Sequence, residues 1–436
     1  MEGTAEEKKA KLKQAACDYH ALPNAGKFQI MPIKAMATQE DLSLAYSPGV
    51  AEPCLEIARD PELAYKYTNK GRMIACISNG TAVLGLGNIG ALASKPVMEG
   101  KAVLFKKFAG VDCVDICVDT PDPETFINVV KYLAPSFGGI NLEDIKGPDC
   151  FTVEEELKKI MPIPVFHDDQ HGTAVICLAG LMNSLEISGK KIDEIKVVVL
   201  GAGASGIACM KLIQKYGAKK ENCFSCDTKG VIWPGRTAGM NPFKLTIAND
   251  TCTKDTTFPE IAAGADVLIG VSAANAFTED IVKSLAKDPV IFAMANPNPE
   301  VLPPKAKEWR PDCIIATGRS DYPNQINNVM CFPFLFRATL DCRASQINEE
   351  MKMAASMAIA KLAHEPVPES VSKAMDGRTF EFGREYVVPT PFDPRLMERI
   401  ACAVAQAAAD SGVAKNPITD FEAYKKKLAE VSMVKK

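Results

Sequence analysis

Two short acidic clusters have the residue types that bind a divalent cation. Glu143 and Asp144 form one cluster, Asp168 and Asp169 form the other, and each cluster follows an apolar run. Carboxylates at strand ends are typical of active-site edges in open α/β sheets. Two or three of these carboxylates, if they converge, would give a hard-oxygen site suited to Mg²⁺ or Mn²⁺.

Tyr46 and Lys101 are candidates for acid–base chemistry. Tyr46 stands beside the rigid turn Ser47-Pro48-Gly49, and Lys101 directly precedes an apolar run at 103–105. A lysine held near a bound cation can have its pKa lowered enough to act as a base, and a tyrosine can serve as the partner acid. Tyrosines and lysines near turns are common, so neither residue identifies a site by itself.

The histidine and cysteine spacings give weaker metal signals. His167 and His171 stand four apart, which on one helix would place both on the same face, as in zinc sites. The preceding run is typical of a strand, and Asp168 and Asp169 are poor helix formers, so polar orienting groups beside the carboxylates are expected instead. Cys223 and Cys226 form a single C-x-x-C pair in an expected strand, which favours buried thiols over a metal.

The pattern G-x-G-x-x-G occurs twice, at 85–90 and 201–206. The second copy lies between an apolar strand at 196–200 and a helix at 207–216, which is the context of a dinucleotide-binding turn. The residues expected to hold the cofactor there are Gly201, Ala202, Gly203, Ala204, Ser205 and Gly206. Pro96 is expected to limit the helix after the first copy to about a turn and a half, so that copy is interpreted as a turn that shapes the substrate cleft.

Asp227 and Lys229 bear on the type of dinucleotide. Asp227 ends the next expected strand, at the distance where an acid binds a free ribose 2′-hydroxyl. Lys229 offers a cation for a 2′-phosphate. The acid favours NAD and the lysine leaves NADP open.

The elements that must position these residues indicate an α/β protein of two domains. The expected strands are 73–77, 103–105, 111–118, 196–200, 222–226, 266–271, 290–295 and 313–316. Helices are expected at 5–20, 125–133, 153–160, 207–216, 348–363, 394–411 and 420–431. We predict a substrate and metal domain over 1–160 and a doubly wound Rossmann-type domain with a helical C-terminal extension over 161–436.

Composition excludes several classes of protein. The 436 residues carry 50 basic and 54 acidic side chains, a net charge of −4 that argues against nucleic-acid or anionic-membrane binding. No apolar run approaches the roughly 20 residues that span a bilayer. The 15 scattered cysteines and the acidic N-terminus indicate a reduced, cytoplasmic enzyme.

Several longer stretches carry a family resemblance. They are 45–51, 77–90, 139–145, 166–173, 317–325 and 391–395. With these stretches in this order, the sequence closely resembles the small-subunit, bacterial-type malic enzymes over essentially its whole length. The resemblance implies oxidative decarboxylation of L-malate to pyruvate and CO₂, reduction of NADP or NAD with NADP favoured, and a Mg²⁺ or Mn²⁺ ion. It also implies a homodimer.

The resemblance assigns roles by motif position. Lys101 matches the general base and Tyr46 the general acid. The implied metal ligands are Glu143, Asp144 and Asp169, and the implied substrate- and cofactor-facing amides are Asn296 and Asn328.

Departures and alternatives follow from the same comparison. Large-subunit relatives carry an arginine that grips a malate carboxylate where this sequence has Ala82, so Arg72 or a partner-subunit residue is a candidate for that role. The phosphotransacetylase-like C-terminal domain of some relatives is not expected. The main alternative is a malolactic enzyme, which turns malate into lactate with bound NAD. Other Rossmann dehydrogenases, or a nucleotide-sensing protein on an inactive scaffold, are further alternatives.

Overall fold

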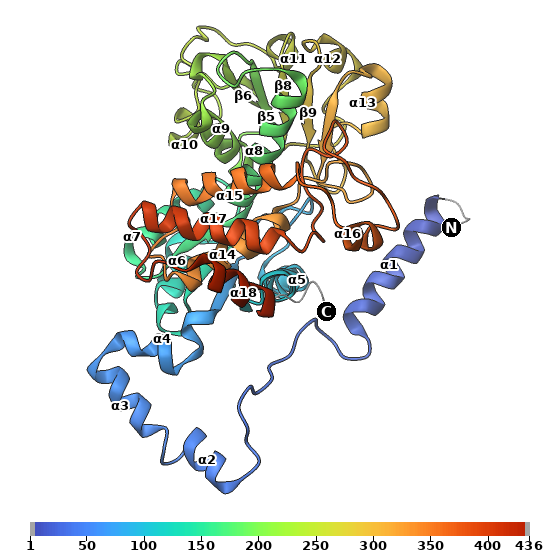
Figure 1. Cartoon of the computed structure of the whole chain (residues 1–436). Coiled ribbons are helices and arrows are strands. Elements are labelled where there is room, and N and C mark those ends of the chain that lie inside the picture. Colours follow the sequence, from blue (N-terminus) through green and yellow to red (C-terminus); the bar gives the residue numbers. More distant parts are fainter. Residues whose placement is uncertain (1–4, 432–436) are drawn as a thin grey trace.

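The computed structural model describes residues 5–431, which fold around two parallel β-sheets (Figure 1). The first sheet has the order β2-β1-β3-β4, and all of its strands are parallel. Its strands are β1 (Met73–Ser78), β2 (Asp112–Cys117), β3 (Gly139–Leu142) and β4 (Val165–His167). Nearly every residue of β1, β3 and β4 is buried, as expected for a parallel sheet covered on both faces.

One helix of this half differs from its prediction. The helix α5 (Ala91–Ala109) continues through Pro96 and includes the expected strand 103–105. An internal proline costs about 3 kcal/mol. Met98 and Phe105 are fully buried on α5, and burial of such a side chain stabilises by about 1.5–3 kcal/mol. Packing against the sheet therefore outweighs the cost of the proline, which local sequence could not show.

The second sheet has the order β10-β9-β8-β5-β6-β7, parallel except for the short antiparallel edge strand β7. Its strands are β5 (Val197–Leu200), β6 (Cys223–Asp227), β7 (Gly230–Val231), β8 (Val267–Gly270), β9 (Val290–Ala293) and β10 (Ile314–Thr317). The chain order reverses between β5 and β8, and a crevice at such a point is where doubly wound sheets bind ligands. The predicted Rossmann-type fold is confirmed.

The long helix α8 (Asp168–Ser188) connects the two halves and is buried along most of its length. It starts directly after β4, which pairs with β3 in the first sheet although it follows the predicted boundary at residue 160. Asp168 and Asp169 begin α8, where the helix dipole favours negative charge. The end of the first sheet and the start of the connecting helix thus form one unit.

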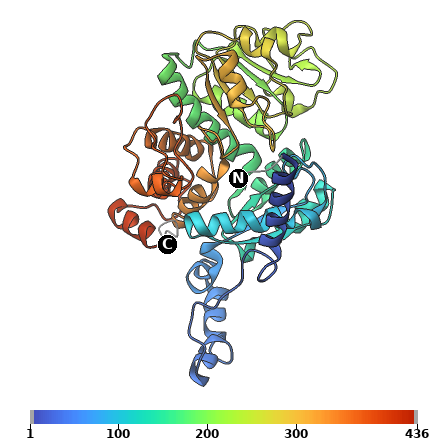
Figure 2. The same ribbon diagram turned by 90° about the vertical axis from the view of Figure 1, so that its right-hand side faces the viewer.

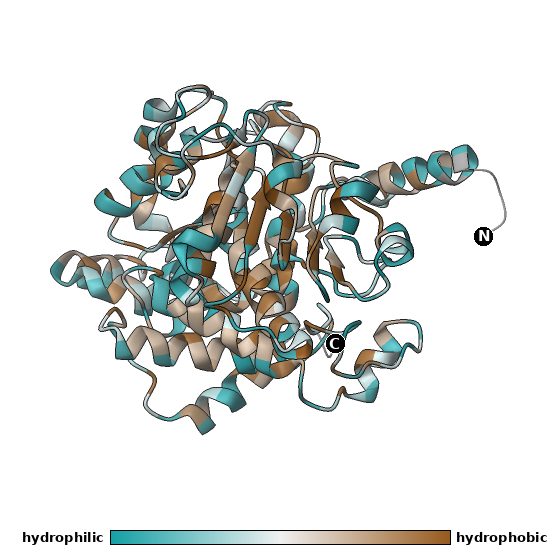
Figure 3. Ribbon diagram, turned by 90° about the horizontal axis from the view of Figure 1, so that it is seen from above, coloured by the Kyte–Doolittle hydropathy of each residue, from teal (hydrophilic) through white to brown (hydrophobic). Residues whose placement is uncertain are grey.

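Helices surround both sheets, and the C-terminal ones cross the middle of the molecule (Figure 1). The helix α14 packs on α5, whereas α15 packs on α8. The remaining helices of the body are α4 (Ala64–Tyr67), α6 (Pro123–Lys131), α7 (Asp149–Ile160), α9 (Ala204–Tyr216), α10 (Pro242–Leu245), α11 (Phe258–Ala262), α12 (Glu279–Ser284), α13 (Pro303–Trp309), α14 (Phe332–Asp341), α15 (Glu349–Leu362), α16 (Glu369–Ala374), α17 (Leu396–Asp410) and α18 (Phe421–Val431). The strands and helices inside the body are rich in apolar residues, which are brown in Figure 3.

Much of the N-terminal segment projects from this body, most clearly the part with α2 and α3 (Figures 1 and 2), while Lys27 Nζ contacts the body by donating to the Pro96 oxygen of α5 at 2.6 Å. We call residues 5–59 the arm; it holds α1 (Ala5–Ala21), α2 (Gln39–Ala45) and α3 (Ala51–Arg59). Thr38 caps α2 with a capping box, so this helix is specified by its own sequence. The described helices of residues 5–431 are all too short or too polar to cross a bilayer.

Candidate active site

A cleft of about 560 Å³ lies between the two sheets and brings most of the predicted site residues together. Its walls come from the ends of β3, β8, β9 and β10, from α5, and from the first turns of α8 and α9. The predicted site residues that line it are Lys101, Glu143, Asp144, Asp169, Gly203, Ala204, Ser205, Asn296 and Asn328.

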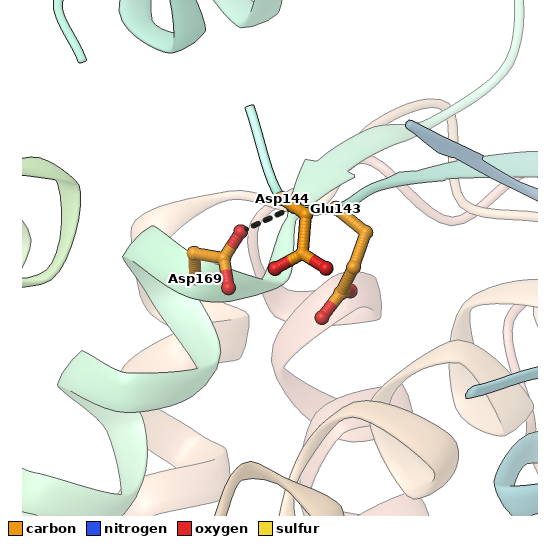
Figure 4. A group of neighbouring side chains, drawn as sticks. All are labelled: Glu143, Asp144 and Asp169. Carbon is orange, nitrogen blue, oxygen red and sulfur yellow. Dashed lines mark hydrogen bonds between the residues drawn. The ribbon is translucent and has the colours of Figure 1, made fainter. Parts of the chain in front are cut away.

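Three carboxylates converge in this cleft (Figure 4). Glu143 and Asp144 directly follow β3, Asp169 lies in the first turn of α8, and one oxygen of each lies within 4.8 Å of the others. The backbone N–H of Asp144 donates to Asp169 Oδ2 at 2.7 Å, while Asp144 Oδ2 is buried without a hydrogen-bond partner among the described residues. This set of oxygen donors fits Mg²⁺ or Mn²⁺.

The pKa values of the three carboxyl groups also indicate a site for a divalent cation. Burial raises the pKa of Glu143 well above its usual range. Burial and the Asp169 carboxylate raise the pKa of Asp144 to about 7. Burial opposes ionisation of Asp169 too, but the nearby His167 imidazole and the charge of Lys101 leave its pKa lowered. Ionised carboxylates this close repel one another, and a divalent cation would remove that repulsion.

Lys101 reaches the cluster from α5. Its Nζ lies 2.6 Å from Asp168 Oδ2, 2.8 Å from Glu143 Oε1, and 4.1 Å from the centre of the Phe332 ring. Burial opposes the charged form, but Asp168 and Glu143 more than offset it and raise the pKa of Lys101 well above its usual range. Asp168 is fully buried and also accepts a hydrogen bond from Asn328 Nδ2 at 3.0 Å. The lysine is therefore held in one position at the cleft.

The two histidines near the second acidic cluster contact different carboxylates. His167 Nε2 lies 3.3 Å from Asp169 Oδ2, whereas His171 Nε2 lies 2.8 Å from Glu154 Oε1. Burial lowers the pKa of His171 to about 4. His167 lies against a carboxylate of the cluster, whereas His171 contacts Glu154 of α7 and so connects α8 to α7. The two imidazoles therefore do not form a zinc-binding pair.

The second glycine motif forms the tight turn from β5 into α9. A Cβ on Gly201 would lie 2.4 Å from the Val271 oxygen, and one on Gly206 would lie 1.8 Å from the Gly201 oxygen, so both positions require glycine. Gly203, Ala204 and Ser205 line the cleft, whereas the lining does not include Gly201, Ala202 or Gly206. Ser205 Oγ also donates to the backbone oxygen of Asp169 at 2.8 Å, which ties the turn to the carboxylate cluster.

The first glycine motif lies on the opposite wall of the same cleft. Leu84 and Gly85 line it. A Cβ on Gly85 would lie 2.3 Å from the backbone oxygen of Asn296, so the glycine lets the two walls approach each other. The motif shapes the cleft, in agreement with the interpretation of its sequence.

Asp227 ends β6 outside the cleft lining and is fully engaged by neighbouring donors. Arg236 donates to both of its oxygens at 2.8 and 2.6 Å, Lys244 Nζ donates at 2.7 Å, and the Lys229 backbone N–H donates at 2.8 Å. Burial opposes ionisation, but the hydrogen bonds from Arg236 and Lys244 lower the pKa of Asp227 to about 2. The expectation that Asp227 offers a free acceptor is wrong, because its acceptor sites are already occupied.

Two candidates lie away from the cleft of their own chain. Tyr46 follows α2 in the arm and is 71% exposed. Arg72 pairs with Asp112 at 2.7 Å on the edge of the first sheet and does not line the cleft. The suggestion that Arg72 replaces the missing arginine is therefore wrong for this chain.

Other residues of the site were missed. Lys146, Thr173, Ser272 and Asn327 also line the cleft. Lys146 stands two residues after Asp144, so its place in the sequence could have indicated that it lies near the site. Glu300 is fully buried and accepts hydrogen bonds from the backbones of Ser272 and Ala295, which joins two cleft loops, but no local pattern marks it.

Comparison with known proteins agrees with this arrangement. Residues 25–158 match the family model of the malic enzyme N-terminal domain, and residues 170–373 match that of the malic enzyme NAD-binding domain. The chain is 55% identical to the NADP-dependent malic enzyme of Halomonas elongata, over 93% of this chain and 95% of that protein. The crystal structure of malic enzyme from Pyrococcus horikoshii is similar with a TM-score of 0.88 and 40% identity, over 96% of this chain and 95% of that one.

A further relative is longer than this chain. The NADP-dependent malic enzyme of Salmonella typhimurium is 59% identical over 419 residues, which are 96% of this chain and 55% of that protein. The chain thus spans about half the length of that curated relative. With both family models matched in order and close relatives that it covers almost completely, the chain belongs to the malic enzyme family.

Proposed function

We propose that this chain catalyses oxidative decarboxylation of L-malate to pyruvate and CO₂ with reduction of NADP⁺. The observation that carries the proposal is one cleft that joins Lys101, the three-carboxylate cluster and the glycine turn of a Rossmann-type sheet. The relatives named as NADP-dependent malic enzymes support it.

The proposed chemistry uses both groups that the cleft fits. The three carboxylates would hold a divalent cation, which would supply polarisation of the C2 oxygen of malate, and the glycine turn after β5 would hold the nicotinamide cofactor, which would supply the hydride acceptor for C2. A cation held by Glu143 and its neighbours would offset the negative charge that keeps Lys101 protonated, so its neutral amine could take the proton of the C2 hydroxyl. Asp168, 2.6 Å from Nζ, would then stabilise the resulting ammonium. Asn296 and Asn328 orient the substrate and cofactor with neutral amides.

We infer that the general acid, Tyr46, acts in the cleft of a partner subunit. The arm exposes a run of large apolar side chains, and such surfaces are normally covered in an assembly. Among them are Ile30, Met31, Ile33, Leu44 and Tyr46, at 89%, 66%, 70%, 69% and 71%. A homodimer in which each arm packs on the other subunit would cover these side chains and bring Tyr46 to the second cleft.

The direct test is the initial rate of malate oxidation with Mn²⁺, measured with NADP⁺ and with NAD⁺. We expect equal amounts of pyruvate and reduced cofactor, a higher kcat/KM with NADP⁺, and complete loss of activity in excess EDTA. Lactate without free reduced cofactor would identify a malolactic enzyme. Activity that survives exhaustive EDTA treatment would contradict the metal site.

The preference for NADP⁺ gives a separate prediction. Because Arg236 and Lys244 saturate Asp227, the end of β6 presents a surplus of positive charge to the adenosine ribose, which favours a 2′-phosphate. We expect Lys244→Gln to raise KM for NADP⁺ roughly tenfold, the effect of one charged hydrogen bond, and to leave KM for NAD⁺ nearly unchanged.

Lys220→Gln provides the matched control, since Lys220 is an exposed lysine of the same domain that pairs with Asp250. It should change neither KM. Equal increases in KM for both cofactors after Lys244→Gln would contradict a phosphate contact and indicate a general structural effect.

A further inference from the structure

The cleft contains few positive charges for a substrate with two carboxylates. Among the described residues that line it, Lys101 and Lys146 are the cations. The ammonium of Lys101 already contacts two carboxylates. Lys146 has only a loose partner, Asp149, at 3.4 Å, and the two side chains are 46% and 26% exposed. An ion pair of this kind contributes little and is easily exchanged.

Backbone hydrogen bonds place the loop with Lys146 beside the turn with Ala82. The Lys146 N–H donates to Thr81 Oγ1 at 3.0 Å, and the Ala82 N–H donates to the Asp144 oxygen at 3.0 Å. The turn with Ala82 and the loop with Lys146 are therefore directly bonded, and both residues line the cleft. A lysine on the second loop can reach the region that an arginine at position 82 would occupy.

We propose that Lys146 binds the malate carboxylate that is retained in pyruvate. This inference rests on the proposed function and extends it. Lys146 supplies a positive charge beside Ala82 from the neighbouring loop.

The chemistry of the reaction selects which carboxylate Lys146 holds. When the C3–C4 bond breaks, its electron pair stays on the three-carbon fragment and the C4 carboxylate becomes neutral CO₂. A cation on that carboxylate would stabilise the ground state more than the transition state and slow the step. The C1 carboxylate keeps its charge throughout, so a lysine there binds substrate, transition state and product alike. Apart from the two lysines and the three carboxylates, the described residues that line the cleft are neutral, among them Asn296, Asn328 and Thr173.

The test compares Lys146→Met with wild type in three measurements. We expect KM for malate and the inhibition constant of pyruvate both to rise roughly 10- to 100-fold, the effect of one charged hydrogen bond, while KM for NADP⁺ stays unchanged. Pyruvate is informative because it retains C1 and lacks C4. Lys146→Arg should keep most of the affinity, and Ala82→Arg combined with Lys146→Met should restore part of it.

Lys159→Met is the matched control, because Lys159 is an exposed lysine on the adjacent α7 that pairs with Glu156. A malate KM within twofold of wild type in Lys146→Met would overturn the inference. A raised malate KM with an unchanged pyruvate constant would overturn the assignment to C1. A wild-type chain that does not oxidise malate would instead contradict the proposed function, so the two failures are distinguishable. Retained NADP⁺ binding shows that the variant is folded.

Discussion

Lys101→Ala is expected to lower kcat for malate oxidation by about 10²- to 10⁴-fold, the usual contribution of a general base. The ammonium of Lys101 lies at the carboxylate cluster, 2.8 Å from Glu143, and the described residues lining the cleft include no second basic group so close to that cluster. Binding of NADP⁺ should be unchanged, because the glycine turn lies on another element. Steady-state rates and equilibrium titration with NADP⁺ measure the two quantities separately.

Removal of Lys101 also leaves buried carboxylates without their counter-charge, so stability needs its own control. Thermal unfolding and NADP⁺ binding show whether Lys101→Ala is folded, and added methylamine should restore part of its rate if the missing group is a base. Lys106→Ala removes an exposed lysine from the same helix that pairs with Asp112, and should leave kcat unchanged. Normal turnover in Lys101→Ala would exclude the proposed role.

Mixing two inactive variants should restore activity if the arm serves a partner subunit. Tyr46→Phe lacks the proposed acid and Lys101→Ala lacks the base, so each homodimer is inactive. Tyr46 is exposed and does not line the cleft of its own chain, and the part of the arm with α2 and α3 projects below the body in Figure 2. In a mixed dimer one cleft receives both intact groups, and random exchange of subunits gives about a quarter of the wild-type rate.

The control mixes Tyr46→Phe with the double variant Tyr46→Phe/Lys101→Ala, which has no intact tyrosine and should remain inactive. Subunits must exchange before the assay, which a tagged variant can verify by co-purification. If verified mixed dimers of the two single variants stay inactive, Tyr46 acts in its own chain or has no catalytic part.

Much of the fold could be predicted because it is specified locally. The buried run at 197–200, the glycine turn after it and the helix at 204–216 form one continuous signal, and they fold as expected. The helix through Pro96 could not be predicted, since the propensity of proline opposes it and the packing of Phe105 against distant residues decides it.

The candidate site divides in the same way. The two acidic clusters were found because carboxylates at strand ends meet at one sheet edge, and the family resemblance selected Glu143, Asp144 and Asp169 from them. The partners of Asp227 were missed because Arg236 and Lys244 lie well beyond it in sequence and return to it only through the fold. The position of Tyr46 depends on where the arm goes, and no pattern within the arm specifies that.

The arm has a chemical property that the body lacks. Its two cysteines, Cys17 and Cys54, are exposed. The other thiols are buried or half-buried, and burial raises the pKa of Cys76 and Cys331 in the body well above the usual range. Thiolates are the reactive form, so an alkylating reagent reaches the arm first. None of the described residues that line the cleft is a cysteine, so inactivation by such a reagent would report on the proposed contact of the arm with a partner subunit.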